Sequence, residues 1–240
     1  MNQFQRTELL IGKTGIEKLN KAHVAVFGVG GVGGYVVEAL VRSGIGEITI
    51  VDNDDINLTN INRQIIATHE TIGRSKVEVM TERIKSINPN CNVHAVQTFF
   101  LPENADQFDF TSYDYVVDAI DTVAAKIALV LNCQEVNTPI ICSMGTGNKL
   151  NPAMFEVADI YKTSVCPLAR VMRSTLKKHG VKKLKVVYSK EIPIDTTAFG
   201  ANQDILEEKT TKRAIPGSSA FCPPVAGLII ASEVVKDLLK

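Results

Sequence analysis

A glycine cluster between two apolar segments constrains this chain more than any other feature. Residues 24–27 are apolar and lead into the motif Gly28-x-Gly30-x-x-Gly33, and a second apolar segment, 47–51, ends at Asp52. Glycines permit a tight turn, and the amino end of the helix that follows can point its N–H groups at phosphate oxygens. A carboxylate at the end of the second strand is placed to accept hydrogen bonds from a ribose. The stretch therefore predicts a nucleotide-binding strand–turn–helix–strand unit, although it does not specify the nucleotide.

The length and composition fit one domain over residues 1–240. The chain is 45% hydrophobic, which is enough for a full core, and its formal net charge is zero. That balance conceals a segregation of charge. Residues 103–121 include six acids and no Lys or Arg, whereas residues 170–190 include eight Lys or Arg and no Asp or Glu. Either run fits a solvated face, and the basic run also fits a surface that binds a polyanion.

Targeting and cysteine patterns narrow the class further. Residues 1–6 lack an apolar signal core, so we expect a cytoplasmic protein. The apolar run from Val225 is interrupted by charged residues, which predicts a helix rather than a membrane span. The five cysteines form no C-x-x-C pair, and this argues against a disulfide framework and against a tetrahedral cysteine zinc site.

The periodicity along the rest of the chain predicts an α/β protein. Polar segments follow expected strands at 52–64 and 144–147, which places them at the edge where open α/β sheets bind ligands. We expect a Rossmann-like three-layer fold, whose parallel nucleotide-binding half continues into a partly antiparallel second half. The expected helices are 7–19 (broken near Gly12 and Gly15), 75–87 (capped by Ser75), 122–137, 167–178 and 226–239; the expected strands are 92–98, 115–119, 139–143, 154–160 and 184–188; and 191–219 is expected to be a mobile loop.

Three residues near this edge suit one particular reaction. If the nucleotide is ATP and a carboxylate attacks its α-phosphate, the enzyme must neutralise charge along three phosphates, with Arg, Lys and a carboxylate-held Mg²⁺. Arg63 lies in the polar loop, Lys76 in the first turn of a helix and Asp121 at the end of a strand. Taken singly, they read as a surface arginine, a helix residue and a helix cap. Their joint position around one glycine loop favours catalysis.

The chain resembles the ubiquitin-activating-enzyme superfamily, whose bacterial members adenylate carboxylates. The resemblance implies ATP and Mg²⁺ as cofactors, Asp52 as the ribose ligand, Asp121 as the magnesium-associated aspartate, and Arg6 as a residue that reaches the phosphates of the neighbouring subunit in a homodimer. The matching motifs are Gly28-x-Gly30-Gly31-x-Gly33, Asp52 with Asn60-x-x-Arg63-Gln64, Gly73-x-x-Lys76, Asp118-x-x-Asp121 and Arg6, six residues before Gly12. The implied phosphate-site residues are Asn60, Arg63 and Lys76, and Gln64 is an implied cofactor-binding residue.

The second half of the chain indicates the branch of that superfamily. Residues 159–173 and 217–227 are similar to those of the tRNA threonylcarbamoyladenosine dehydratases, some of which have Asp where Cys166 stands. This resemblance implies ATP-dependent cyclisation of threonylcarbamoyladenosine beside the tRNA anticodon. It also leaves room for a cysteine-desulfurase partner in sulfur relay. The basic residues that we expect to contact tRNA are Arg170, Arg173, Lys177, Lys178, Lys182, Lys183 and Lys185.

Several alternatives stay open at this stage. An adenylase of the C-terminal glycine of a ubiquitin-like sulfur carrier would usually carry two C-x-x-C pairs, which this chain lacks. An NAD-dependent dehydrogenase fits the glycine motif, and a non-catalytic tRNA-binding or sulfur-relay scaffold fits a retained pocket, but both leave Arg63, Lys76 and Asp121 unexplained. Cys166 and Cys222 are expected to be small core residues rather than nucleophiles. The four histidines show no ligand spacing and receive no role.

Overall fold

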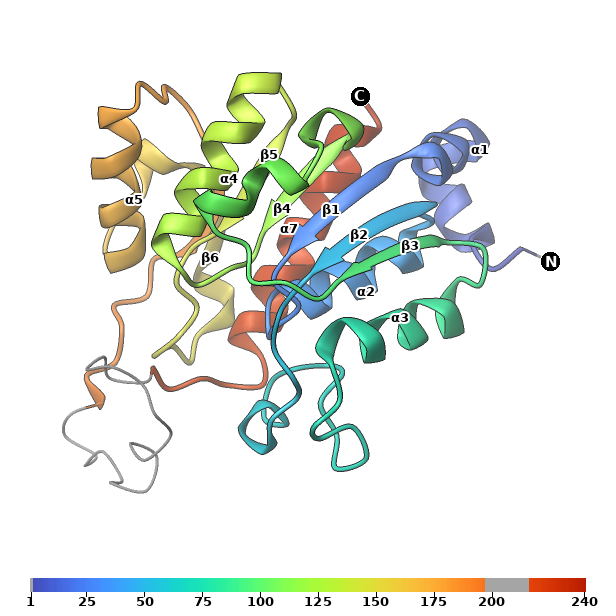
Figure 1. Cartoon of the computed structure of the whole chain (residues 1–240), viewed down its shortest axis with the longest axis horizontal. Coiled ribbons are helices and arrows are strands. Elements are labelled where there is room, and N and C mark those ends of the chain that lie inside the picture. The colour runs from blue at the N-terminus through green and yellow to red at the C-terminus, as the bar shows by residue number, and fades with distance from the viewer. Residues whose placement is uncertain (1, 197–215) are drawn as a thin grey trace.

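The computed structural model describes residues 2–196 and 216–240, and a seven-stranded sheet forms its centre (Figure 1). The strand order is β3-β2-β1-β4-β5-β7-β6, and every neighbouring pair is parallel except β6 with β7. The strands are β1 (His23–Phe27), β2 (Glu47–Val51), β3 (Asn92–Val96), β4 (Tyr115–Asp118), β5 (Ile140–Ser143), β6 (Phe155–Asp159) and β7 (Lys185–Ser189).

Helices cover both faces of this sheet and complete three layers (Figure 1). One face packs against α2, α3 and α7, and the other packs against α4 and α5. The helices are α1 (Gln5–Lys21), α2 (Gly33–Ser43), α3 (Lys76–Ile87), α4 (Val123–Val136), α5 (Pro167–Lys178) and α7 (Cys222–Leu238); the short 3₁₀ helices are η1 (Leu58–Asn60), η2 (Pro102–Gln107), η3 (Phe110–Ser112), η4 (Pro152–Met154) and η5 (Ile160–Lys162).

Strand β1 shows why these residues occupy the middle of the sheet. Successive side chains of a strand point to opposite faces. Val24 and Val26 therefore pack with α2 and α7, whereas Ala25 and Phe27 pack with α4 and a group of phenylalanines. All four are fully buried. A continuous apolar run is what a parallel strand covered on both faces requires.

The predicted elements are present, and the differences lie at their ends. Helix α1 departs from helical geometry at Gly12 (φ 73°), as expected, but continues through Gly15. Ser75 precedes α3 without making a side-chain cap, and its Oγ is buried with no hydrogen-bond partner among the described residues. Helix α7 begins at Cys222, four residues before the expected Ala226, because prolines are tolerated in a first helical turn.

The second half is partly antiparallel, as predicted. Strand β7 runs parallel to β5, and β6 alone among the described strands is reversed. Of the expected loop 191–219, residues 197–215 lie outside the described part. At its start, the Glu191 carboxylate accepts the backbone N–H groups of Leu150 and Asn151, at 2.9 and 3.0 Å. No helix within 2–196 and 216–240 has the length and hydropathy that a membrane crossing requires.

Candidate nucleotide-binding site

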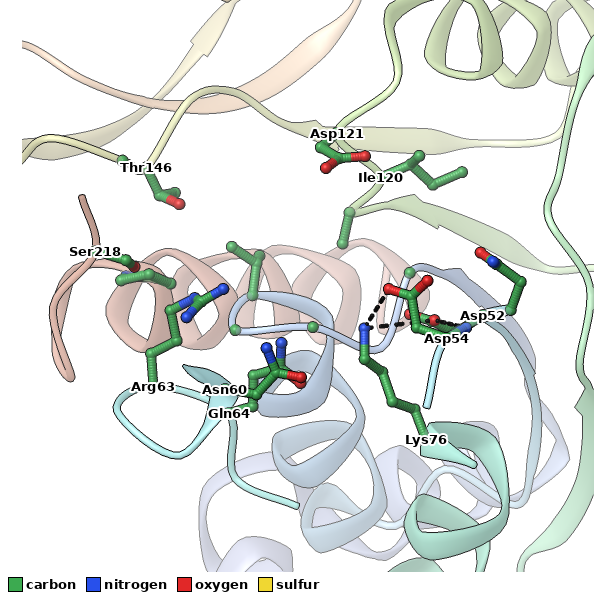
Figure 2. Close-up of a pocket in the computed structure, with 18 of the residues that line it drawn as sticks. Asp52, Asp54, Asn60, Arg63, Gln64, Lys76, Ile120, Asp121, Thr146 and Ser218 are labelled. Carbon is green, nitrogen blue, oxygen red and sulfur yellow. Dashed lines mark hydrogen bonds and ion pairs between the residues drawn. The ribbon is translucent and has the colours of Figure 1, made fainter. Parts of the chain in front are cut away.

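A pocket of about 440 Å³ opens at the carboxyl ends of the central parallel strands (Figure 2). Segments that follow β1, β2, β3, β4 and β5 form it, and the residues just before α7 close one side. Its lining residues are Gly28, Gly30, Gly31, Val32, Val51, Asp52, Asn53, Asp54, Asn60, Arg63, Gln64, Lys76, Thr98, Phe99, Phe100, Ala119, Ile120, Asp121, Thr146, Gly147, Pro216, Gly217, Ser218 and Pro223.

The glycine loop is shaped by close backbone contacts. Gly28 has a φ of +92°, and a Cβ placed on it would lie 2.7 Å from the Ala119 carbonyl oxygen. A Cβ on Gly33 would lie 1.7 Å from the Gly28 carbonyl oxygen, so helix α2 can start this close to the loop only without a side chain there. Gly30 is different, because its nearest neighbour would be Gln64 Nε2 at 3.9 Å. Backbone packing therefore does not require a glycine at position 30, and the absence of a side chain there leaves space for a ligand in the pocket.

Asp52 links the glycine loop to helix α3. Its Oδ2 accepts the Val29 N–H at 2.7 Å, and its Oδ1 accepts the Asp54 N–H at 2.9 Å. Lys76 Nζ lies 3.6 Å from Asp52 Oδ1 and donates to Asp54 Oδ2 at 2.7 Å (Figure 2). Asp52 and Lys76 are nearly buried, whereas Asp54 is exposed. A buried ammonium held beside an exposed carboxylate can exchange that partner for a phosphate at small structural cost.

The polar loop brings two further predicted residues to the pocket. Arg63 donates to the Thr59 carbonyl oxygen at 2.9 Å and to Asn62 Oδ1 at 2.8 Å, which holds its guanidinium toward the pocket (Figure 2). Burial lowers the pKa of Arg63, but a guanidinium stays charged at neutral pH. Gln64 is buried, and its Oε1 has no hydrogen-bond partner among the described residues. A buried acceptor without a donor at a pocket wall fits a ligand or an ordered water.

Asp121 reaches the pocket from the end of β4. Its carboxylate is exposed, and its Oδ1 lies 3.4 Å from Thr122 Oγ1. Magnesium favours carboxylate oxygens together with substrate phosphates, so this residue fits the predicted metal role. Asn60 also lines the pocket, and its Oδ1 accepts the Asn57 N–H at 3.0 Å, which closes the turn before Arg63.

Some predicted site residues lie elsewhere. Gly33 is not part of the pocket wall of the described chain, and its position explains helix packing instead. Arg6 is exposed on α1 and does not line the pocket of its own chain. Arg173 donates to the Thr163 carbonyl oxygen at 3.0 Å, and Lys185 is ion-paired with Glu233 and Asp237. The remaining predicted tRNA contacts are exposed, namely Arg170, Lys177, Lys178, Lys182 and Lys183.

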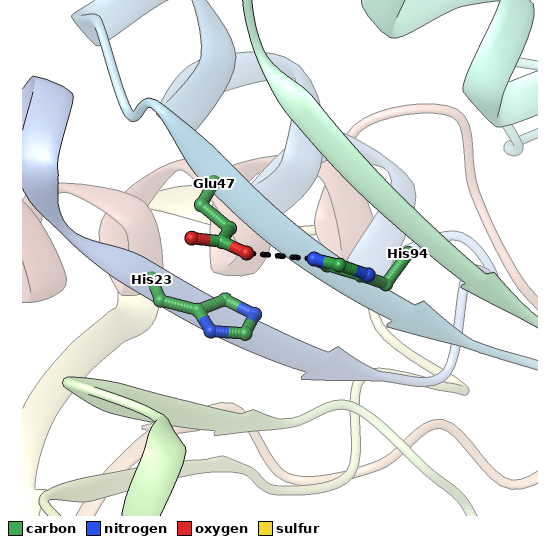
Figure 3. Close-up of side chains that lie close together, drawn as sticks. All are labelled: His23, Glu47 and His94. Atoms are coloured by element: carbon green, nitrogen blue, oxygen red, sulfur yellow. Dashed lines mark hydrogen bonds and ion pairs between the residues drawn. The ribbon is translucent and has the colours of Figure 1, made fainter.

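The structure adds residues that the sequence did not single out. Asp54 is the partner of Lys76, and the run of acids around it was the available signal. Thr146 and Ser218 face the pocket from segments far apart in the chain (Figure 2). The four histidines received no role from the sequence, but the structure brings His23 and His94 close to Glu47 on neighbouring strands (Figure 3).

The cysteines are buried, as expected. All five are free thiols with buried side chains, including Cys166 and Cys222. Burial raises the pKa of Cys91 to about 11 and that of Cys133 to about 12, and it also raises the pKa of Cys222. A thiol becomes a good nucleophile as a thiolate, so this environment suppresses reactivity at those positions.

The fold and the pocket define a Rossmann-like nucleotide-binding α/β protein. A model of the ThiF family matches residues 4–240, and the chain belongs to that family. The tRNA threonylcarbamoyladenosine dehydratase of Bacillus subtilis is 47% identical over 246 residues, covering 100% of this chain and 96% of the relative. Its counterpart in Escherichia coli is 43% identical over 73% of this chain and 65% of the relative. The structure of E. coli tRNA N6-threonylcarbamoyladenosine dehydratase in complex with ATP superimposes with a TM-score of 0.88 at 35% identity, covering 99% of this chain and 93% of that one.

Proposed function

We propose that this protein binds ATP and cyclises the threonylcarbamoyl side chain of threonylcarbamoyladenosine in tRNA, with net loss of water. The observation that carries the proposal is the convergence of Asp52, Arg63, Lys76 and Asp121 on one pocket behind the glycine loop. Full-length similarity to a dehydratase supports the choice of substrate. An NAD enzyme would need the glycine loop and Asp52 but not the two cations and the second carboxylate.

The chemistry follows from the poor electrophilicity of a carboxylate. A carboxylate oxygen of the threonyl group attacks the α-phosphate, and the bond to pyrophosphate breaks. The carbamoyl group of the same side chain then attacks the activated acyl carbon and loses a proton to solvent. AMP leaves with the former carboxylate oxygen, so the side chain loses the elements of water. Both reacting groups belong to one side chain, which supplies proximity without a protein nucleophile. Arg63 and Lys76 stabilise the charge on the phosphates, and Asp52 orients the ribose.

Magnesium completes the proposed cofactor set. Asp121 is the residue that would hold it, because its exposed carboxylate faces the pocket (Figure 2). The ion would supply positive charge at the phosphate oxygens when it is bound. Lys76, Arg63 and the backbone N–H groups of the glycine loop carry the rest of the phosphate binding.

A homodimer with a shared site is the proposed assembly. Arg6 is exposed on α1 and does not line its own pocket, so a role at the phosphates requires a second chain. Leu9 and Leu10 are 83% and 86% exposed on the same helix. Two adjacent exposed leucines on the helix that carries Arg6 fit a contact surface between chains, and we assign the partner as a second copy.

The proposed tRNA surface is the exposed part of the basic run. Arg170, Lys177 and Lys178 lie on α5, and Lys182 and Lys183 follow it. Lys185 is excluded from this surface, because two carboxylates already neutralise its ammonium. A cysteine-desulfurase partner finds no support in the thiols, since all five are buried.

The decisive experiment combines purified protein, ATP and tRNA that carries threonylcarbamoyladenosine, with mass spectrometry of the digested nucleosides. We expect the nucleoside to lose one water as AMP is released, and Asp121→Ala to abolish the loss. Asp106→Ala is the matched control, because Asp106 is an exposed acid of the same run outside the pocket. If the nucleoside stays intact while ATP–pyrophosphate exchange continues, threonylcarbamoyladenosine is not the substrate. Ubiquitin-like sulfur carriers would then be tested as substrates. If no ATP is consumed or exchanged, the proposed adenylating activity is contradicted as well.

A further inference from the structure

Three chemically distinctive side chains meet on neighbouring strands at a place the proposed reaction does not use. His23 pairs with Glu47 in the register of β1 with β2, and Glu47 pairs with Asn92 in the register of β2 with β3. His94 lies two residues beyond Asn92 and therefore projects from the same face of the sheet. One ligand atom from each of His23, Glu47 and His94 lies within 4.8 Å of the other two (Figure 3).

The cluster lies at the opposite ends of the strands from the nucleotide pocket. His23 and Glu47 are the first residues of β1 and β2, whereas the pocket opens where these strands end. The side chains of Glu47 and His94 are 36% and 47% exposed, so a hydrated ion can reach them. None of the three lines the nucleotide pocket.

The positions of His23 and His94 suit binding of one shared metal ion. His94 Nε2 lies 2.7 Å from Glu47 Oε1, and the rings of His23 and His94 have centroids 5.4 Å apart. Four-coordinate zinc has bonds of about 2.0–2.1 Å to nitrogen and oxygen, which places its ligand atoms roughly 3.3 Å from one another. The ligand atoms of the three residues lie within 4.8 Å of one another, and rotations of the exposed His94 and Glu47 side chains can bring them to this spacing.

Polar neighbours orient the three groups. Thr49 Oγ1 lies 2.8 Å from His23 Nε2, and Asn92 Nδ2 donates to Glu47 Oε1 at 3.0 Å. Such outer partners fix ring orientation and strengthen metal sites.

We propose that His23, Glu47 and His94 bind one divalent transition-metal ion, with Zn²⁺ as the best fit and water at the fourth position. Two imidazoles and one carboxylate form a donor set that zinc sites with an open position use. The ion would tie together the amino ends of β1, β2 and β3. Because β3 is an edge strand of the sheet, this tie would act on stability, and the adenylation chemistry would stay at the carboxyl ends of the strands.

The test is a zinc titration of the purified full chain without an affinity tag, in competition with a chromophoric chelator. We expect one equivalent of Zn²⁺ per chain and a rise in Tm on binding. His94→Gln should weaken zinc binding roughly 100-fold, because loss of an orienting partner alone weakens such sites 10–100-fold. His179→Gln is the matched control, since His179 is an exposed histidine elsewhere, and it should bind zinc as the wild type does.

Cobalt provides a second readout that does not depend on activity or on stability. Four-coordinate Co²⁺ with nitrogen ligands absorbs visible light more strongly than the hydrated ion. We expect this absorption in the wild type and its loss in His94→Gln and Glu47→Gln, with unchanged circular dichroism. Equal zinc affinity in the wild type and the His23→Asn/His94→Gln double variant would overturn the site. Failure of the wild-type protein to withdraw Zn²⁺ from the chelator would overturn it as well.

Discussion

Lys126 Nζ lies 2.8 Å from Asp118 Oδ2, and neither side chain has any exposed surface. The same ammonium donates to the carbonyl oxygens of Ser143 at 2.8 Å and Ile120 at 3.2 Å. It therefore joins the end of β4, the end of β5 and the turn that leads to Asp121. The pair lies directly behind the pocket wall, so it connects the stability of the sheet to the position of the proposed magnesium residue.

Removing one member of this pair should be strongly destabilising. Lys126→Met leaves the Asp118 carboxylate buried without its cation, and the expected loss is about 3–5 kcal/mol in the free energy of unfolding. Urea denaturation followed by circular dichroism measures it, with Lys178→Met as the exposed control. The double variant Lys126→Met/Asp118→Asn should lose less than the single variant, because it buries no unpaired charge. A single-variant loss below about 1 kcal/mol would contradict this assignment.

The glycine loop offers a contrast between packing and ligand binding. Gly33→Ala would place a Cβ 1.7 Å from the Gly28 carbonyl oxygen, so we expect a marked drop in Tm. Gly30→Ala has its nearest contact at 3.9 Å, so Tm should hold while ATP affinity falls, because the new methyl group occupies the pocket. Thermal unfolding with and without ATP, together with calorimetric titration, separates the two effects. If both variants change Tm equally, the distinction between the glycines fails.

Strand and helix positions were predictable because their periodicity is local. A partly antiparallel second half was also predicted, but the pattern did not identify β6 as the reversed strand, because only pairing with β7 decides its direction. Ser75 was expected to cap α3 from its type and place, but burial of its hydroxyl prevailed over that local preference.

The pocket residues were predictable for a related reason. In an open parallel sheet, loops that follow the strands share one edge, so Arg63 and Asp121 could be placed together from the order of elements. The grouping of His23 with His94 depends on strand register across 71 residues of sequence, and no local spacing encodes it. Asp54 was missed because any of several neighbouring acids could have reached Lys76.

The position of Arg6 makes a prediction about shared sites. If Arg6 acts on the neighbouring chain, Arg6→Ala and Asp121→Ala homodimers should each be inactive, but mixed dimers contain one intact site. Equal mixing with free exchange of subunits should then restore roughly a quarter of the wild-type rate, since half of the dimers are mixed and half of their sites are intact. ATP–pyrophosphate exchange measures it, with sedimentation to confirm the dimer. A mixture no more active than its components would place Arg6 in its own chain's site or outside catalysis.

The basic surface predicts how tRNA affinity depends on salt. Arg170 and Lys178 lie eight residues apart on α5, so they are separated by roughly 12 Å along the helix axis, which is long enough to contact more than one phosphate. Each lysine–phosphate contact that releases a counterion changes the slope of log affinity against log salt by about 0.7 to 0.9. Lys177→Ala/Lys178→Ala should therefore reduce the slope by about 1.4 to 1.8 if both lysines contact phosphates.

The matched control for this slope is Lys13→Ala/Lys21→Ala, a pair of exposed lysines on α1 rather than α5. Filter binding over a range of potassium chloride concentrations gives both slopes, and ATP–pyrophosphate exchange checks that the pocket is intact. Lys185→Ala should act differently, because Lys185 is paired with Glu233 and Asp237. We expect that variant to lower Tm and leave the slope unchanged. An equal change of slope in the α1 control would mean that net charge, rather than the α5 surface, governs tRNA binding.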